Sequence, residues 1–244
     1  MRTIVWFIYF WGYLLFKWPA MSKGLKALEA GDWETADRLA GHHVPEWANA
    51  LLRLAGVSIT VEGRENIPEG RACVFVGNHR SYYDIPLALT QLGGAYGLVA
   101  KKEVDKIPLV RGWMRLLHCV FLDRDDARKA MATLNEAIEI VKKGYSITIF
   151  PEGTRNKGKE GTLLEFKSGA FRIATKSGAP LVPIAITGSR NIMENNGGWM
   201  RPAHVTIRIL PPIETQGLSK EEIRALPERT AALIEQNLLP NKEA

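Results

Sequence analysis

Two residues of one short segment have the types needed for acid–base catalysis: His79 and, five positions later, Asp84. A histidine titrates near neutral pH, so it can take a proton from a hydroxyl group. A carboxylate beside it can fix its tautomer and stabilise the imidazolium ion that forms. A helix has about 3.6 residues per turn, so the two side chains can meet only if the chain turns between them.

A structural role for the same segment is also open. Ser81 followed by Asp84 is typical of a helix N-terminus of the capping-box kind, with Asp in place of Glu or Gln. In that case Asp84 would only complement the helix dipole.

The segment follows an apolar run, residues 72–76, that predicts a buried strand ending at Gly77. From Val57 onward, short β-branched runs alternate with helical patterns, which predicts an α/β domain with a largely parallel or mixed central sheet flanked by helices. The expected strands are 57–61, 72–76, 97–100, 119–122, 146–150, 181–186 and 205–210. The expected helices are 86–92, 109–117, 127–143, 167–176 and 220–237.

Charged residues follow several of these strands directly, and in α/β folds the loops beyond the carboxyl ends of strands collect ligands. In chain order they are His79, Lys101 with Lys102, Asp123-Arg124-Asp125 and Glu152-Gly153-Thr154-Arg155. Arg binds phosphate through two parallel hydrogen bonds, and Lys supplies a mobile charge. The pattern indicates a site for a phosphorylated substrate with a hydroxyl to deprotonate.

Ordinary ion pairs and solvated charges are the structural alternatives at these positions. In those alternatives Arg124 pairs with Asp125 or Asp126, Glu152 pairs with Arg155, and Lys101 and Lys102 are solvated.

The N-terminal residues 1–56 are expected to form a helical hairpin or small bundle that binds membranes, ahead of the α/β domain at 57–244. Residues 3–16 are almost wholly apolar and rich in Trp and Tyr, but fall short of the roughly 20 residues of a spanning helix. We expect a helix anchored in one leaflet or the interface, with a full span and a buried core helix as alternatives. Pro45 is expected to open a second apolar helix that Gly56 closes.

Composition favours an anionic partner, because the 244-residue chain has a formal net charge of +6. A membrane surface, a phosphorylated substrate, an acidic carrier protein and nucleic acid all qualify. Cys73 and Cys119 lie in apolar runs and are interpreted as core residues. The chain lacks paired Cys/His spacings and nucleotide-binding glycine motifs, so we expect neither a metal nor a cofactor.

Four sequence blocks resemble those of the glycerol-phosphate and lysophosphatidate acyltransferases, most nearly the bacterial 1-acyl-sn-glycerol-3-phosphate acyltransferases. The blocks are Asn78-His79-x4-Asp84, Phe121-x2-Arg124, Phe150-Pro151-Glu152-Gly153-Thr154-Arg155 and Val182-Pro183-Ile184. The resemblance covers about residues 57–210. Val120 and Leu122 stand where Ile is common in the family, which keeps an aliphatic strand.

The resemblance implies a membrane-bound enzyme of phospholipid biosynthesis on the cytoplasmic face of the inner membrane, with no nucleic-acid partner. It would transfer an acyl group from acyl carrier protein or acyl-CoA to the sn-2 hydroxyl of lysophosphatidic acid, giving phosphatidic acid. His79 and Asp84 would be catalytic. The substrate-binding residues would be Lys101, Arg124, Glu152, Gly153, Thr154 and Arg155. Acylation of glycerol 3-phosphate or another lysolipid, and a non-catalytic module that binds anionic lipid, are the alternatives.

Overall fold

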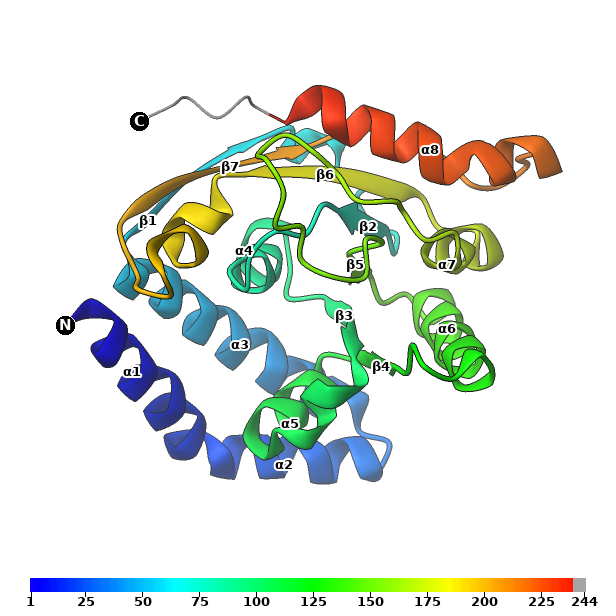
Figure 1. Cartoon of the computed structure of the whole chain (residues 1–244). Coiled ribbons are helices and arrows are strands. Elements are labelled where there is room, and N and C mark those ends of the chain that lie inside the picture. Colours follow the sequence, from blue (N-terminus) through cyan, green and yellow to red (C-terminus); the bar gives the residue numbers. More distant parts are fainter. Residues whose placement is uncertain (239–244) are drawn as a thin grey trace.

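Within residues 1–238, which the computed structural model describes, seven strands form one mixed sheet (Figure 1). They are β1 (Val57–Glu62), β2 (Val74–Gly77), β3 (Gly97–Lys101), β4 (Val120–Leu122), β5 (Ile147–Ile149), β6 (Leu181–Thr187) and β7 (Ala203–Ile209). Their order is β1-β7-β6-β2-β5-β3-β4, and all neighbours are parallel except the antiparallel β6 and β7. The predicted α/β fold is therefore confirmed. The last residues of the predicted α/β domain, 239–244, lie outside the described residues.

Helices cover both faces of this sheet (Figure 1). They are α1 (Arg2–Phe16), α2 (Trp18–Glu29), α3 (Trp33–Ala55), α4 (Asp84–Gln91), α5 (Pro108–Leu116), α6 (Ala127–Lys142), α7 (Gly169–Ser177) and α8 (Lys220–Asn237). Alternate residues of β2 enter different cores, because successive side chains of a strand point to opposite faces. Val74 and Val76 pack with α6, α7 and α8, whereas Phe75 packs with α3 and α4.

The five helices predicted after residue 57 all form, within two residues of their expected bounds. Helix α6 shows the local causes. Its N-cap residue, Asp126, accepts hydrogen bonds from the backbone N–H groups of Arg128 and Lys129. After its C-terminus, Gly144 takes a left-handed backbone conformation with φ of 97°.

The prediction that a helix begins at Pro45 is wrong, because α3 runs from Trp33 to Ala55 with Pro45 inside it. An internal proline removes one backbone hydrogen bond and crowds the preceding turn, at a cost of about 3 kcal/mol or more. The buried stripe of α3 continues on both sides of Pro45, and its packing offsets that cost. The stripe consists of Ala36, Ala40, Val44, Ala48, Leu51, Leu52 and Ala55.

The N-terminal helices share a core with the α/β region. The indole N–H of Trp6 in α1 donates to the Leu51 carbonyl oxygen, and its ring lies 5.9 Å from that of Tyr83. Leu51 of α3 belongs to the same buried cluster as Phe75 of β2. The division into two domains at residues 56 and 57 stays a prediction.

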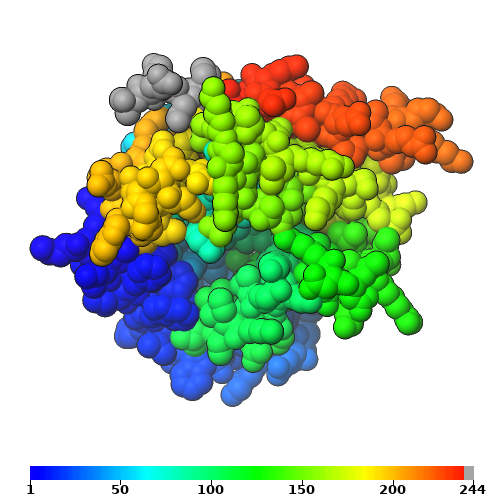
Figure 2. All heavy atoms as spheres, viewed as in Figure 1, coloured from blue at the N-terminus to red at the C-terminus, as the bar shows by residue number. Residues whose placement is uncertain are grey.

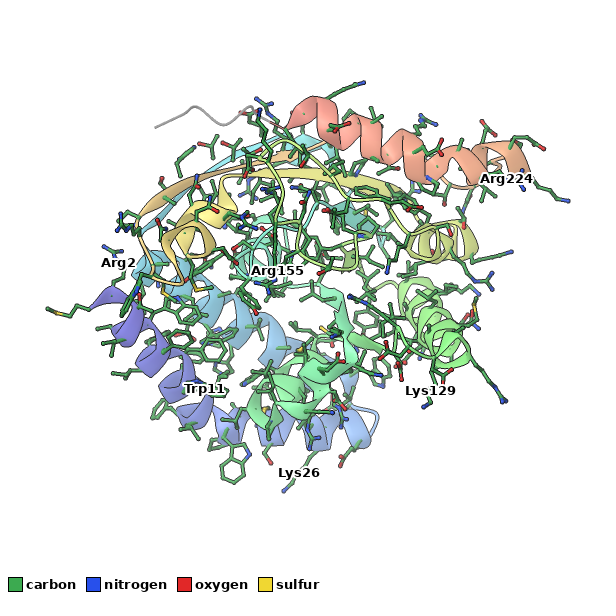
Figure 3. The ribbon with its side chains drawn as sticks, viewed as in Figure 1. Arg2, Trp11, Lys26, Lys129, Arg155 and Arg224 are labelled. Carbon is green, nitrogen blue, oxygen red and sulfur yellow. The ribbon has the colours of Figure 1, made fainter. Side chains whose placement is uncertain are left out.

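The outer side of α1 is apolar and exposed. Ile4, Ile8, Trp11 and Leu15 recur at helical spacing with 58%, 68%, 42% and 61% of their surface exposed, and Figure 3 shows Trp11 at the edge of the molecule. No single helix of residues 1–238 has the length and hydrophobicity to cross a membrane. Helices α1 and α2 satisfy those criteria only together, across a bend of 50°.

Neither cysteine is expected to react with thiol reagents while the protein is folded. Cys73 and Cys119 are free and buried, as the sequence predicts. Burial raises the pKa of Cys73 to about 11 and that of Cys119 to about 12, and only the thiolate is nucleophilic. We expect iodoacetamide at about pH 8 to modify either thiol only after denaturant is added. Peptide mass spectrometry checks this, and rapid modification of Cys73 in native protein would contradict it.

Candidate active site

The structure brings His79 and Asp84 into contact. Strand β2 ends at Gly77, and the chain turns before α4 begins at Asp84. His79 Nδ1 lies 2.8 Å from Asp84 Oδ2; Asp84 is fully buried, whereas 18% of the His79 side chain is exposed. A carboxylate oxygen accepts hydrogen bonds, so the proton of a neutral imidazole lies on Nδ1. The lone pair of Nε2 then remains to accept a proton.

The same carboxylate oxygen also holds the backbone of the turn. Asp84 Oδ2 accepts hydrogen bonds from the N–H groups of Arg80 and Ser81, at 2.7 and 2.8 Å. The capping-box alternative is met only in part: Asp84 accepts from the Ser81 N–H, but the Asp84 N–H donates to the carbonyl oxygen of Ser81 rather than to its hydroxyl. Orientation of the imidazole and support of the helix start are thus compatible roles of Asp84.

Glu152, which follows β5, binds the backbone of His79. Its Oε1 accepts from the backbone N–H of His79 at 2.7 Å, and its Oε2 accepts from that of Leu164 at 2.9 Å. The residue is 3% exposed. Burial raises the pKa of Glu152, and the two N–H donors oppose that rise. The carboxylate thus binds backbone N–H groups. The alternative ion pair of Glu152 with Arg155 is not seen among the described residues.

Three further contacts fix the position of His79. Its ring stacks on Phe150, with centroids 4.5 Å apart and planes inclined by 22°. Its carbonyl oxygen accepts from the Asn156 N–H at 2.7 Å. Buried Asn78 exchanges two hydrogen bonds with the backbone of Ile186, at 2.7 and 2.8 Å, and so ties the end of β2 to β6.

Arg155 lies beside this turn. Its guanidinium carbon is 3.5 Å from the centre of the Tyr82 ring, a cation–π distance. Its Nη1 is 3.5 Å from Glu194 Oε1, and 28% of the side chain is exposed. Figure 3 shows Arg155 near the middle of the molecule, beside α4.

Arg124 reaches the same loop, because its Nη1 donates to the carbonyl oxygen of Gly153. Gly153 has a φ of 71°, a left-handed backbone conformation that favours glycine, and the Lys167 side chain lies against it. Lys167 is therefore another cation beside the loop. Thr154 is exposed next to Gly153.

Lys101, the last residue of β3, is largely exposed. Its side chain is 56% exposed, with its ammonium group 3.3 Å from Glu103. Lys102 instead pairs with Asp123 and Asp125, at 2.7 and 2.8 Å. Asp125 thus forms its ion pair with Lys102, and the alternative ion pair of Asp125 with Arg124 is not seen among the described residues.

The molecular surface is hollowed where these segments converge. Figure 2 shows teal atoms of the early α/β region at the bottom of the hollow, between segments coloured lime, yellow, green and blue. Parallel strands β2, β3, β4 and β5 end at this edge of the sheet. A separate cavity of about 380 Å³ lies at the amino ends of strands, lined by Asp37, Arg71, Tyr96, His118 and Tyr145. It contains none of the predicted site residues.

Two carboxylates of the site, Glu160 and Glu194, were not predicted from the sequence. Glu160 pairs with Arg80 at 3.2 Å, and their side chains are 5% and 3% exposed. Glu194 accepts from Ser81 Oγ and from the Tyr82 N–H, at 2.8 and 2.9 Å. Both follow their partners by about 80 residues or more along the chain, and no spacing rule links groups so far apart.

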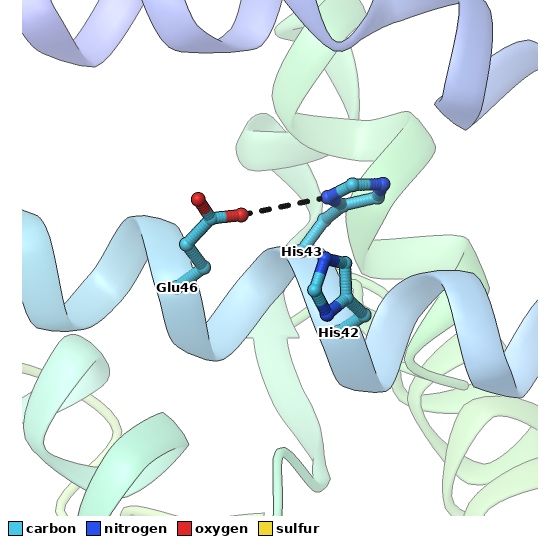
Figure 4. Close-up of side chains that lie close together, drawn as sticks. All are labelled: His42, His43 and Glu46. Atoms are coloured by element: carbon cyan, nitrogen blue, oxygen red, sulfur yellow. Dashed lines mark ion pairs between the residues drawn. The ribbon is translucent and has the colours of Figure 1, made fainter.

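One group of residues among 1–238 has ligand atoms close enough for a metal ion: His42, His43 and Glu46 on α3 (Figure 4). His43 Nδ1 lies 3.7 Å from Glu46 Oε2, which also accepts from the Tyr13 hydroxyl at 2.8 Å. Burial, then the charges of Lys17 and His42, lower the pKa of His43. The charge of Lys17 would also repel a metal ion at this position. We therefore assign these contacts to the packing of α1 on α3, which the Tyr13–Glu46 hydrogen bond joins.

Comparison with known proteins gives concordant matches. A family model described as "Acyltransferase" matches residues 58–187, more than half of the chain. A 1-acyl-sn-glycerol-3-phosphate acyltransferase of Saccharomyces cerevisiae is 31% identical over 77% of this chain, which spans 64% of that relative. One from Borreliella burgdorferi is 33% identical over 70% of this chain and 68% of its own length.

A solved structure is similar over almost its whole length. The 1-acyl-sn-glycerophosphate (LPA) acyltransferase PlsC from Thermotoga maritima has a TM-score of 0.72 and 29% sequence identity. The match covers 97% of this chain and 96% of the other, so it includes the N-terminal helices as well as the sheet.

Proposed function

The chain belongs to the acyltransferase family, and we propose that it transfers a fatty acyl group from a thioester to the sn-2 hydroxyl of lysophosphatidic acid. The product would be phosphatidic acid. The observation that carries the proposal is the His79–Asp84 contact at a strand exit, with Arg155 beside the same turn. It supplies a base for a hydroxyl and a cation for a phosphate.

The reaction would proceed by direct attack, with His79 as general base. Nε2 takes the proton of the sn-2 hydroxyl, and the oxygen bonds to the thioester carbonyl carbon. The carbon–sulfur bond then breaks, and the imidazolium ion returns its proton to the leaving thiolate. Asp84 holds Nδ1–H throughout and stabilises the imidazolium ion. The acyl donor would be acyl carrier protein or acyl-CoA, both of which present an acyl thioester.

The test is direct. Purified protein is incubated with lysophosphatidic acid and each acyl donor in turn, and phosphatidic acid is measured by mass spectrometry. Glycerol 3-phosphate and a neutral monoacylglycerol are offered as competing acceptors. The proposal fails if lysophosphatidic acid is not acylated, or if glycerol 3-phosphate is acylated faster.

Arg155→Ala is expected to raise the KM for lysophosphatidic acid by roughly 10- to 150-fold, because it removes a charge-assisted contact worth about 1.5–3 kcal/mol. Steady-state kinetics with varied acceptor measures this. Arg224→Ala on α8, exposed and distant in Figure 3, is the matched control. An equal loss of activity toward neutral monoacylglycerol would count against phosphate recognition by Arg155.

We also propose that α1 binds the membrane from the cytoplasmic face, without crossing it. The exposed apolar stripe of α1 supports this, since burying each such side chain contributes about 1.5–3 kcal/mol. Lys17, Lys23 and Lys26 follow the stripe and suit anionic headgroups. The protein would thus meet its lipid substrate in one leaflet.

Ile8→Asp combined with Leu15→Asp is therefore expected to release most of the protein from vesicles that contain phosphatidylglycerol. Both side chains belong to the exposed stripe, so the fold should persist. Co-sedimentation measures the bound fraction, and Ile223→Asp on α8, a 40% exposed site, is the control. Unchanged binding of the double variant would refute the anchoring role of α1.

A further inference from the structure

We propose that Glu194 is a positioning residue that couples the turn carrying His79 to the phosphate-binding Arg155. This inference rests on the proposed function. Glu194 belongs to a short 3₁₀ turn, Glu194–Asn196, that follows β6. Its side chain is only 13% exposed, although it carries a charge.

Each oxygen of this carboxylate holds a different group of the turn. Glu194 Oε2 accepts from the hydroxyl of Ser81 at 2.8 Å, and Oε1 accepts from the backbone N–H of Tyr82 at 2.9 Å. Ser81 Oγ in turn accepts from the N–H of Tyr83. Asp84 holds the Ser81 N–H from the other side. The turn is therefore clamped between two carboxylates from different parts of the fold.

Glu194 also holds Arg155. Its Oε1 is 3.5 Å from Arg155 Nη1, while the ring of Tyr82 lies under the same guanidinium group. A guanidinium group has five N–H donors, so an ion pair at one nitrogen leaves donors for a phosphate. One oxygen thus fixes both the backbone of Tyr82 and the cation stacked on its ring. The distance between His79 and the phosphate site is set through this oxygen.

The segment that carries Glu194 is itself fixed to the site. Arg190 Nη1 donates to the Asn156 carbonyl oxygen at 3.0 Å, and the Asn156 N–H donates to the carbonyl oxygen of His79. Asn196 Nδ2 donates to the Asn191 carbonyl oxygen at 2.7 Å. Glu194 therefore acts from a braced position rather than from a loose loop.

Two substitutions separate the hydrogen bonds from the charge. Glu194→Gln keeps the size and one acceptor, so kcat should stay within about threefold, while the KM for lysophosphatidic acid should rise about 5- to 20-fold. Glu194→Ala removes both acceptors and should also lower kcat by about 10- to 100-fold. Glu214→Gln, which breaks the exposed pair with Arg71, is the control and should change neither constant.

A double-mutant cycle tests the coupling itself. In an Arg155→Ala background, Glu194→Gln should add no further increase in KM, because the guanidinium group it positions is gone. Additive effects on KM would overturn the proposal. A decrease in KM would overturn it as well, since that result would mean that Glu194 merely repels the phosphate.

Hydrogen exchange gives a readout that does not depend on turnover. Exchange of the Tyr82 amide should be about tenfold faster or more in Glu194→Ala than in Glu214→Ala. Unchanged exchange would overturn the positioning role. If the wild-type protein acylates no lysophosphatidic acid, the proposed function fails, but this exchange measurement still decides whether Glu194 holds the turn.

Discussion

His79→Ala is expected to lower the rate of acyl transfer by about 10²- to 10⁴-fold, the usual contribution of a general base. Without the imidazole, nothing at this position can take the proton of the acceptor hydroxyl. The fold should persist, because the backbone N–H of His79 keeps its bond to Glu152 and its carbonyl oxygen keeps the bond from Asn156.

Single-turnover assays with phosphatidic acid confirmed by mass measure the rate, and circular dichroism measures the thermal midpoint. His204→Ala is a suitable control, since His204 is an exposed histidine of β7 that bonds Ser58 and lies outside the site. Near-normal turnover of His79→Ala would remove the catalytic assignment. A non-catalytic lipid-binding protein would then explain the anchor and the basic charge.

Asp84→Asn is expected to slow turnover by roughly 10- to 150-fold without misplacing His79. The N–H groups of Arg80 and Ser81 require an oxygen where Asp84 Oδ2 lies, so the amide oxygen of Asn should take that place. It can then still accept from His79 Nδ1–H, and the tautomer is kept. What is lost is the negative charge that stabilises the imidazolium ion, about 1.5–3 kcal/mol.

Stability should also fall, by about 1–3 kcal/mol, because the Asn amide nitrogen replaces Asp84 Oδ1 in a buried position with no hydrogen-bond partner among the described residues. Denaturant unfolding and single-turnover kinetics separate the two effects. If Asp84 only supports the start of α4, turnover should stay within about twofold, since Asn keeps that support. That outcome would exclude a role in acid–base catalysis.

The fold was predictable where local pattern and burial agree. The apolar run before His79 forms the fully buried β2, and the stripe of α6 together with Asp126 gives its bounds. The order of the strands was not predictable, because the pairing of β2 with β6 and of β1 with β7 depends on contacts far apart in sequence. Pro45 led to a wrong prediction of a helix start, because the packing of α3 keeps the helix continuous through the proline.

In the candidate site, too, the features set by local sequence were predictable and those set by long-range contacts were not. The placement of His79 and Arg155 beyond strand ends was predictable, because each follows an apolar run within a few residues. The burial of Glu152 behind the turn was not, since sequence cannot tell a carboxylate that faces solvent from one that accepts backbone N–H groups. Glu194 was missed entirely, because its hydrogen-bond partners Tyr82 and Ser81 lie 112 and 113 residues away.

The backbone N–H groups of residues 79 to 82 are all taken by side-chain carboxylates: Glu152, Asp84 and Glu194. A helix N-terminus of this kind commonly binds phosphate through its free amides, and here protein groups already occupy them. Under the proposed function, headgroup recognition therefore falls to long side chains such as Arg155 and Arg124. Substitution of these side chains can then change substrate preference without disturbing the main-chain hydrogen bonds that hold His79.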